Sequence, residues 1–293
     1  MEQHADPARS ALAAECARQI DAQGGIPTRN PEELLEVFTL LTWAQAALEE
    51  AGKPQAGEIR DAIARMAPTL RALRHADGGL ARFHGGGRGL DGRLDQALAA
   101  SGVKRRKVDG LAMGFARLAA GRTTVILDAA PPPVGAASAD AHASTLAMEL
   151  TSGRRPMIVN CGAGHDFVED WHRAGPAFDR AMDSVRLAGI PFKLHFHLHP
   201  DVDVALDMGG TAVSMALRSG EIWVLRTHGA VEISIEPSVY MEKGRLQPRA
   251  TKQIVLSGTA MEYATRVRWT LAKAQETEVA IRDLVQDEVD VSL

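Results

Sequence analysis

The sequence predicts an α+β protein, in which N-terminal helices precede an antiparallel β-sandwich-like domain. Through the first 75 residues, apolar side chains recur every three or four positions, as on one face of an α-helix. From Leu111 onward they alternate with polar ones, which is typical of strands with one buried face. A glycine-rich stretch, residues 77–93, separates the two patterns. We therefore expect helices and a connector in residues 1–110, a β-domain in residues 111–275 and an acidic C-terminal helix in residues 276–293.

The first helix is expected over residues 7–20, where Leu12, Cys16 and Ile20 recur at every fourth position. Asp6 has a side chain suited to capping the first free backbone N–H groups. Pro7 suits the first helical position, because its ring presets φ and its missing N–H is not needed there.

A second helix is expected to begin at Asn30-Pro31-Glu32-Glu33. Asn30 can cap it, and Glu33 can close a capping box by reaching back to the cap. A third helix is indicated by apolar residues at helical spacing, namely Ile59, Ile63, Met66, Leu70 and Leu73. The short breaks between these helices favour antiparallel pairs.

The β-rich part begins with a predicted strand over residues 123–128. Residues 145–150 and 156–159 are apolar and flank Gly153, which predicts a β-hairpin with its loop at residues 151–155. Further alternating segments are residues 193–198, 212–217, 222–226, 231–236 and 266–271. Several antiparallel strands of this kind suggest a β-sandwich.

Composition narrows the class of protein. Hydrophobic residues make up 45% of the 293 residues but aromatic residues only 4%, so the core must consist mainly of aliphatic side chains. The formal net charge of −4 argues against a general nucleic-acid binder. No apolar run approaches the length of a membrane span, so no membrane partner is expected. The start of the chain lacks the basic and apolar pattern of a secretory signal, which favours a cytoplasmic location.

Residues 138–162 contain the most informative motifs. The segments Asp140-Ala141-His142-Ala143-Ser144 and Asn160-Cys161-Gly162 resemble two strand motifs of the heparinase II/III group of polysaccharide lyases. The resemblance extends to RFHGGG in the connector and to FHLHPDVD, GEIWVLR and RVRWTLA nearer the C-terminus. It implies that the helices are the last part of an incomplete α/α toroid and that the strands form the family's C-terminal β-sandwich.

The resemblance also implies an activity, β-elimination beside a uronic acid in an anionic polysaccharide such as a glycosaminoglycan. In such a reaction a base removes the proton α to the carboxylate, and cationic or amide groups neutralise that carboxylate. The implied catalytic residues are His142, His84 and Arg82, with Arg82 on the substrate carboxylate. Four further residues are candidates for substrate binding, namely Arg88, Asn160, Lys104 and Arg105. The family often works outside the cytoplasm, so the resemblance adds a periplasmic or cell-envelope location as an alternative.

Histidines provide a candidate metal site. His195, His197 and His199 alternate along one strand and so share one face. Neutral imidazoles are good zinc ligands. The family carries a structural zinc in its β-domain, and the resemblance implies His142, His197 and His199 as its ligands. A solvated histidine face and a cupin-type metal site are the alternatives.

The chain departs from the family pattern at several places. Asp140 stands where the family has its catalytic histidine, and Asn160 stands where an aspartate is usual. The two tyrosines, Tyr240 and Tyr263, both lie in the β-rich part and are expected to be packing residues. Between residues 175 and 190 the family carries further strands, whereas this chain has only a short connection. The chain thus resembles a shortened member of the family.

Three functions follow as hypotheses: a polysaccharide lyase, a non-catalytic carbohydrate-binding or remnant scaffold, and a small metal-binding β protein. The HGGG segment at His84 also resembles the oxyanion loop of esterases. That alternative requires a G-x-S-x-G nucleophile motif, which the sequence lacks. The basic run beginning at Lys104 can steer a polyanion or can simply be a solvated loop. Nothing in the sequence specifies the polysaccharide or the oligomeric state.

Overall fold

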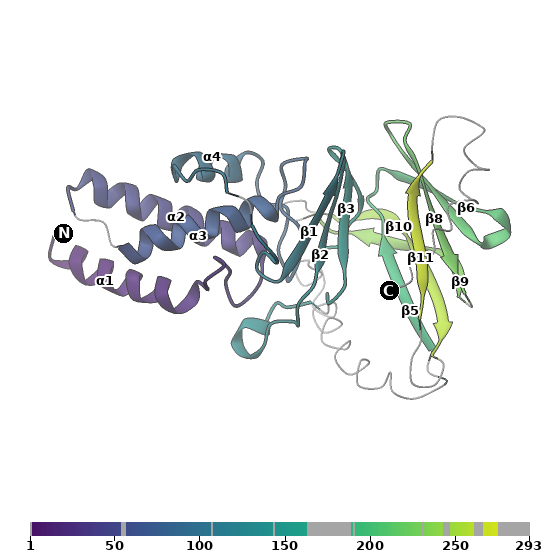
Figure 1. The fold of residues 1–293 in the computed structure, drawn as a ribbon, viewed down its shortest axis with the longest axis horizontal. Helices are drawn as coiled ribbons and strands as arrows, with labels where there is room; N and C mark the ends of the chain where they lie inside the picture. Colours follow the sequence, from purple (N-terminus) through teal and green to yellow (C-terminus); the bar gives the residue numbers. More distant parts are fainter. Residues whose placement is uncertain are drawn as a thin grey trace. The chain divides into compact units, whose positions relative to one another are not determined.

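The computed structural model describes residues 2–53, 57–106, 108–142, 144–162, 189, 191–229, 231–242, 247–260 and 266–274. The chain divides into two compact units (Figure 1). The first comprises Met1–Met182 and Tyr240–Arg249, and the second comprises Asp183–Val239 and Ala250–Leu293. Helices followed by antiparallel sheets confirm the predicted fold class. The predicted C-terminal helix over residues 276–293 lies outside the described residues.

The first unit begins with helices. Their bounds are α1 Glu2–Gln19, α2 Pro31–Glu50, α3 Gly57–Ala72 and α4 Arg93–Ala100. Asn30 caps α2 by accepting the N–H groups of Glu32 and Glu33 at 2.9 and 3.2 Å, as the sequence predicts. The Glu33 side chain instead accepts the hydroxyl of Thr28 at 2.6 Å, so the predicted capping-box contact gives way to a bond with the preceding loop.

The predicted start of α1 is wrong. The helix begins at Glu2, and Pro7 lies inside it rather than at its first position. A proline so near an N-terminus removes only one hydrogen bond of the helical ladder, which the rest of the helix tolerates. Asp6 therefore does not cap this helix.

One core joins the helices to the first sheet. The helical residues of α3 that were predicted to face inward are buried, including Ile59, Met66 and Leu70. They belong to the same cluster as Phe83 in the connector and Phe115 at the start of the sheet. The rings of Phe83 and Phe115 lie 4.6 Å apart between centroids. The helices and the sheet of the first unit therefore fold as one body.

The sheet of the first unit is antiparallel, with strand order β1-β2-β3-β4. Its strands are β1 Phe115–Ala120, β2 Thr123–Asp128, β3 Met148–Ser152 and β4 Arg155–Ile158, and a short 3-10 turn, η1, covers Gly135–Ser138. The predicted hairpin is present, with a tighter turn than expected, because β3 and β4 extend to Ser152 and Arg155 and leave only Gly153 and Arg154 between them. Every residue of β3 after Met148 is buried, so this strand is covered on both faces.

The second unit contains a three-stranded sheet of order β5-β10-β9 and a four-stranded sheet of order β11-β8-β7-β6. Phe196 of β5 meets Trp269 of β11 edge to face, with centroids 5.1 Å apart, so side chains of the two sheets pack together as in a sandwich. The elements are β5 Pro191–His197, β6 Val202–Asp207, η3 Met208–Gly210, β7 Ala212–Leu217, β8 Ile222–His228, β9 Glu232–Tyr240, β10 Arg249–Thr259 and β11 Arg268–Lys273. Among the described residues, no helix is both long and apolar enough to cross a membrane.

Candidate functional site

The glycine-rich connector is a packed segment of the first unit. Residues 79–87 are all buried. Backbone hydrogen bonds fold the segment onto itself, including Leu80 N–H to the carbonyl of Arg88 at 2.9 Å. Gly86 allows a close approach to α2, because a Cβ there would lie 2.3 Å from the side-chain oxygen of Asn30. The connector is therefore not a solvated loop, and Arg82 and His84 are directed into the protein.

Arg82 belongs to a cluster of buried polar groups around Glu149, which we call the Glu149 cluster. Its guanidinium Nη1 lies 3.1 Å from Glu149 Oε1, and the His75 Nε2 atom lies 2.9 Å from Glu149 Oε2. The backbone N–H groups of Arg82 and Asn160 also donate to this carboxylate, at 3.3 and 3.1 Å. Four donors surround one carboxylate that is 0% exposed, so its lone pairs are well satisfied.

The electrostatics of this cluster favour a permanent ion pair. Burial alone would raise the pKa of Glu149, but the charge of Arg82 and the hydrogen bond from His75 lower it to about 2. Burial likewise disfavours the charged guanidinium, but Glu149 outweighs that effect and raises the pKa of Arg82. The guanidinium also lies over the ring of Tyr240, 5.7 Å from its centroid. Arg82 is 6% exposed and already neutralised, so it is not a free cation for a substrate carboxylate.

His84 belongs to a second group of buried polar residues, the Asp128 cluster. Ser144 Oγ donates to Asp128 Oδ2 at 2.6 Å, and His84 Nε2 lies 3.4 Å from the same oxygen. The guanidinium of Arg29 donates to the other oxygen, Oδ1. Burial would raise the pKa of Asp128, but the hydrogen bonds from His84, Ser144 and Arg29 lower it. The carboxylate therefore stays charged and holds these three side chains in place.

The hydrogen bonds of His84 indicate its tautomer. The backbone N–H of His142 donates to His84 Nδ1 at 3.3 Å, so the ring proton lies on Nε2, which faces Asp128. His84 is 1% exposed and both of its ring nitrogens have partners. A base in a β-elimination needs a free nitrogen that can reach the substrate proton.

The Asp128 cluster contains the residue types of a serine-protease triad in a different arrangement. In a triad the histidine bridges the serine and the carboxylate through its two nitrogens. Here Ser144 donates directly to Asp128, and its hydroxyl lies 3.5 Å from the same nitrogen of His84 that faces Asp128. The arrangement does not activate Ser144 as a nucleophile, and it gives no support to the esterase alternative.

Backbone strain is concentrated around Asp128. Arg29, His84, Met113 and Leu146 all have positive φ angles, between 49° and 67°, although none is glycine. Each is tied to this region: Arg29 Nε donates to the carbonyl of Met113 at 3.1 Å, and Leu146 N–H donates to that of Asp128 at 2.9 Å. Such conformations cost about 1 kcal/mol or more each and persist where surrounding contacts impose them. The two clusters thus hold the connector firmly against the sheet.

The structure places the remaining candidates of the first unit around these clusters. The side-chain amide of Asn160 donates to the carbonyl of Arg82 at 2.6 Å, so Asn160 acts as a brace of the connector. His142 is half-buried next to His84, and Asp140 is exposed. Arg88 lies 3.7 Å from Asp77 and 3.4 Å from Asp91, while its Nε has no hydrogen-bond partner among the described residues.

The basic run lies apart from both clusters. Lys104 and Arg105 are exposed on the loop after α4. The backbone carbonyls of Val103 and Lys104 accept hydrogen bonds from Arg71, at 2.7 and 3.5 Å. Arg105 also lines a hollow, which is described below.

The histidines implied as zinc ligands come from both units of the chain. His142 belongs to the first unit, whereas His197 and His199 belong to the second. His197 Nδ1 lies 2.9 Å from Ser238 Oγ, and His199 Nδ1 accepts the backbone N–H of Asp201 at 3.2 Å. Burial and the charge of His195 lower the pKa of His197 to about 4, so its ring is neutral at pH 7. Within the described residues, no group of three or more His, Cys, Asp or Glu side chains is placed to hold a metal.

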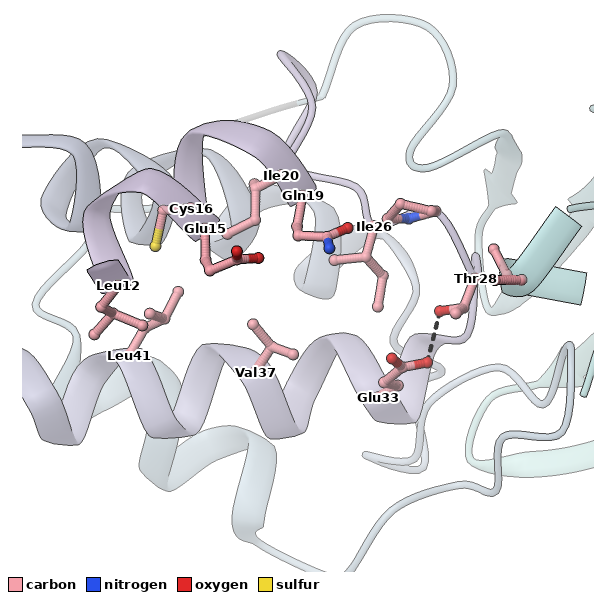
Figure 2. Close-up of a pocket in the computed structure, with 13 residues that line it drawn as sticks. Leu12, Glu15, Cys16, Gln19, Ile20, Ile26, Thr28, Glu33, Val37 and Leu41 are labelled. Carbon is pink, nitrogen blue, oxygen red and sulfur yellow. Dashed lines mark hydrogen bonds between the residues drawn. The ribbon is translucent and has the colours of Figure 1, made fainter. Parts of the chain in front are cut away.

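A further hollow, of about 400 Å³, lies between α1 and α2 (Figure 2). Apolar side chains such as Leu12, Ile20 and Val37 point into it, and the bond between Thr28 and Glu33 lies at one end. None of the candidate site residues lines this hollow.

Sequence reasoning missed the two central carboxylates. Asp128 and Glu149 are the residues around which Arg82 and His84 are organised, yet neither stood out among the candidates. A signal was present for Glu149, because a carboxylate within the apolar run at residues 145–150 suggests a buried, paired charge. His75, Arg29 and Ser144 had no comparable signal, because their partners lie 16 to 99 residues away in sequence.

Comparison with known proteins identifies relatives of this chain. The model of the heparinase II/III-like C-terminal family matches residues 102–178 and 179–270. FtsZ-localized protein C of Caulobacter vibrioides is 26% identical over 356 residues, which cover 92% of this chain and 62% of that protein. Those 356 residues exceed the length of this chain, so the alignment contains gaps on the side of this chain.

Solved structures share the fold. The heparan sulfate lyase HepC from Pedobacter heparinus matches with a TM-score of 0.68 at 11% identity, over 90% of this chain and 55% of that chain. A heparinase III structure matches with a TM-score of 0.71 at 11% identity, over 90% and 56%. This chain therefore spans little more than half the length of these lyases and about three-fifths of the curated relative.

Proposed function

Because this chain belongs to the heparinase II/III-like family, we propose that it is a non-catalytic member that binds an anionic polysaccharide. One observation carries the proposal: the two connector side chains expected to act in elimination are both buried and bonded within the protein. Arg82 is paired with Glu149, and His84 is held between Asp128 and the backbone of His142.

The chemistry of elimination explains why this arrangement matters. The reaction needs a cation that neutralises the substrate carboxylate and a base that reaches the proton next to it. Freeing Arg82 for a substrate would leave Glu149 as an unpaired buried charge, which is strongly unfavourable. Freeing His84 would likewise remove a hydrogen bond from buried Asp128. Neither side chain can turn to a ligand without disrupting the interior.

The relatives are compatible with a binding role. The solved lyases suggest that the ligand is an anionic polysaccharide, although at 11% identity they establish only the fold. The curated relative that covers 92% of this chain is named for localisation with FtsZ, and its name states no reaction. Binding and localisation require the scaffold but not a catalytic base.

A second candidate function is the lyase activity itself, with His142 as the base. His142 is only half-buried and lies near exposed Asp140, so this part of the segment between η1 and β3 is accessible. The fold shared with heparinase III also favours this alternative.

Incubating the purified chain with heparin, heparan sulfate, chondroitin sulfate and alginate separates the two functions. Elimination creates an unsaturated uronate with a strong ultraviolet absorbance, whereas binding alone does not. We expect retention of at least one polymer in calorimetry and no rise in absorbance. A rise that disappears in His142→Ala would establish the lyase instead. No binding to any of the polymers would refute the proposed function.

A further inference from the structure

The first unit contains a hollow whose charged lining is entirely cationic. It measures about 430 Å³, within the range of sites for small ligands. Its floor is formed by apolar groups at the end of α3 and the start of β1, including Pro68, Ala112 and Phe115. Among the described residues, four arginines line it and no aspartate or glutamate does. We call it the arginine hollow; its arginines are Arg71, Arg105, Arg106 and Arg117.

Two of these arginines are fixed by the backbone. Arg117 donates through Nη1 to the carbonyls of Ala72 and Arg74, at 3.0 and 2.6 Å, and so caps the C-terminal end of α3. Arg71 donates to the carbonyls of Val103 and Lys104. These bonds use only some of the five N–H donors of each guanidinium. The two cations are thus held in place, and their remaining N–H groups can donate to a ligand.

The other two arginines have no structural role that contacts within the described residues explain. Arg105 and Arg106 are exposed, and neither makes an ion pair or side-chain hydrogen bond with a described residue. Burial and then the charge of Arg105 lower the pKa of both Arg71 and Arg117. The positive charges of the hollow therefore repel one another, and no carboxylate among the described lining residues compensates them. A bound anion would reduce this repulsion.

We propose that the arginine hollow is an anion-binding site that takes a sulfate or carboxylate group of an acidic sugar. Guanidinium groups bind such planar or tetrahedral oxyanions through paired hydrogen bonds. The apolar floor lowers the local dielectric and strengthens the attraction. The site is separate from the Glu149 and Asp128 clusters, and only the identity of its ligand as a sugar depends on the proposed function.

The test compares two double variants of equal charge loss. Arg105→Gln with Arg106→Gln removes the two arginines of the hollow that belong to the exposed basic run. Arg154→Gln with Arg155→Gln removes two adjacent exposed arginines from the turn between β3 and β4. Lys104→Gln is a second control, because Lys104 belongs to the basic run but does not line the hollow. All five side chains are exposed, so each variant should fold.

Calorimetric titrations of the full chain use heparin oligosaccharides, an unsulfated polyuronate and inorganic sulfate as probes. We expect the Arg105/Arg106 variant to bind the preferred oligosaccharide at least about tenfold more weakly, because it loses charge-assisted hydrogen bonds to the anion. The two control variants should change affinity less than about threefold, as expected for rim charges screened by salt. The ratio of the affinities for heparin and for the unsulfated polyuronate distinguishes recognition of sulfate from recognition of carboxylate.

Three outcomes would overturn the inference. One is an unchanged affinity in the Arg105/Arg106 variant, which would leave polysaccharide binding intact but place it elsewhere. Another is an equal loss in the Arg154/Arg155 variant, which would show diffuse attraction. The third is equally tight binding of a DNA duplex, which would exclude selectivity for acidic sugars. Conversely, if no polysaccharide binds but sulfate does so through Arg105 and Arg106, the anion site stands and the proposed function fails.

Discussion

Glu149 is the residue on which the polar interior of the first unit depends. A buried carboxylate is unfavourable unless its charge is paired and its lone pairs accept hydrogen bonds. Glu149 meets both conditions through Arg82, His75 and the backbone of residues 82 and 160. Because these partners come from the residues after α3, from the connector and from the end of β4, one side chain joins three separate segments.

Replacing Glu149 by Gln should therefore be costly. The amide keeps the shape but leaves the guanidinium of Arg82 without a counter-charge in a buried site. We expect the free energy of unfolding to fall by about 3 kcal/mol or more, as for other broken buried pairs. Urea denaturation followed by helical circular dichroism measures it, since α1–α4 all belong to the first unit. Glu36→Gln, at an exposed position of α2, is the control and should stay within about 0.5 kcal/mol.

The same carboxylate predicts a pH dependence. Its folded pKa, about 2, lies below its usual value, so the folded state binds fewer protons than the unfolded chain between these values. The stabilisation is present in full above about pH 5 and is lost as the pH falls toward 2. We expect about 3 kcal/mol of the unfolding free energy to disappear over this window. The Glu149→Gln variant should show a flatter profile, and an identical profile in both proteins would contradict the assignment.

At the residue scale, the sequence predicts the candidates but not their partners. Arg82 and His84 stand out in the sequence because they lie in a glycine-rich segment. Their burial was not predictable, because Glu149 lies 67 residues from Arg82 and Asp128 lies 44 from His84. Pairings over such distances depend on how the connector packs on the sheet, and local patterns do not encode that packing.

At the scale of elements, the turn after α1 is attached directly to α3. Thr69 Oγ1 donates to the carbonyl of Gln23 at 2.6 Å, and Arg65 Nε donates to that of Asp21 at 3.1 Å. Gly24 makes this approach possible: its φ is +79°, and a Cβ there would lie 2.2 Å from the backbone oxygen of Arg65. The end of α1 and α3 are therefore held together by contacts to the backbone as well as by apolar side chains.

Two glycine-to-alanine variants test this contact. Gly52, at the end of α2, has a similar φ of +64° but no atom within 4 Å of a built Cβ. Gly52→Ala should lower the unfolding free energy by about 1 kcal/mol, the cost of an L-residue in this conformation. Gly24→Ala should cost about 2–4 kcal/mol, since overpacking against backbone adds to that strain. Equal losses in denaturant melts would mean that the turn can move away from α3.

The elements were the most predictable part of the fold. Residues 123–128 form the expected strand, and the hairpin and the α2 cap appear where alternation and capping chemistry place them. The start of α1 was mispredicted because Pro7 is a strong local signal that the longer helix overrides. Interactions between residues close in sequence determine short turns and caps, whereas packing against the rest of the protein determines where a helix begins and ends.

At the scale of the whole molecule, the chain runs back from the second unit into the first, since Tyr240–Arg249 belongs to the first. Tyr240 is buried there, and burial raises the pKa of its phenol. It lies over Arg82, so it contributes to the Glu149 cluster as a packing group, as the sequence suggested. The first unit is thus completed by a segment that follows most of the strands of the second.

Because the chain has two units, hydrogen exchange on the complete chain can show which unit binds the ligand. All the arginines of the arginine hollow belong to the first unit. A ligand that binds only the folded state stabilises it, by about 2.7 kcal/mol at one hundred times its Kd. In hydrogen exchange, we expect a bound oligosaccharide to slow exchange at the end of α3 and along β1, and to leave β6–β8 unchanged.

The arginine variants serve as test and control for the hydrogen-exchange measurement. Protection of α3 and β1 should disappear in the Arg105/Arg106 variant and persist in the Arg154/Arg155 variant, because only the former lies in the arginine hollow. Protection confined to β5 and β10 would instead place the ligand on the strand that carries His195 and His197. That result would contradict the anion site while preserving a carbohydrate-binding role for the family scaffold, because the ligand would still select the folded chain.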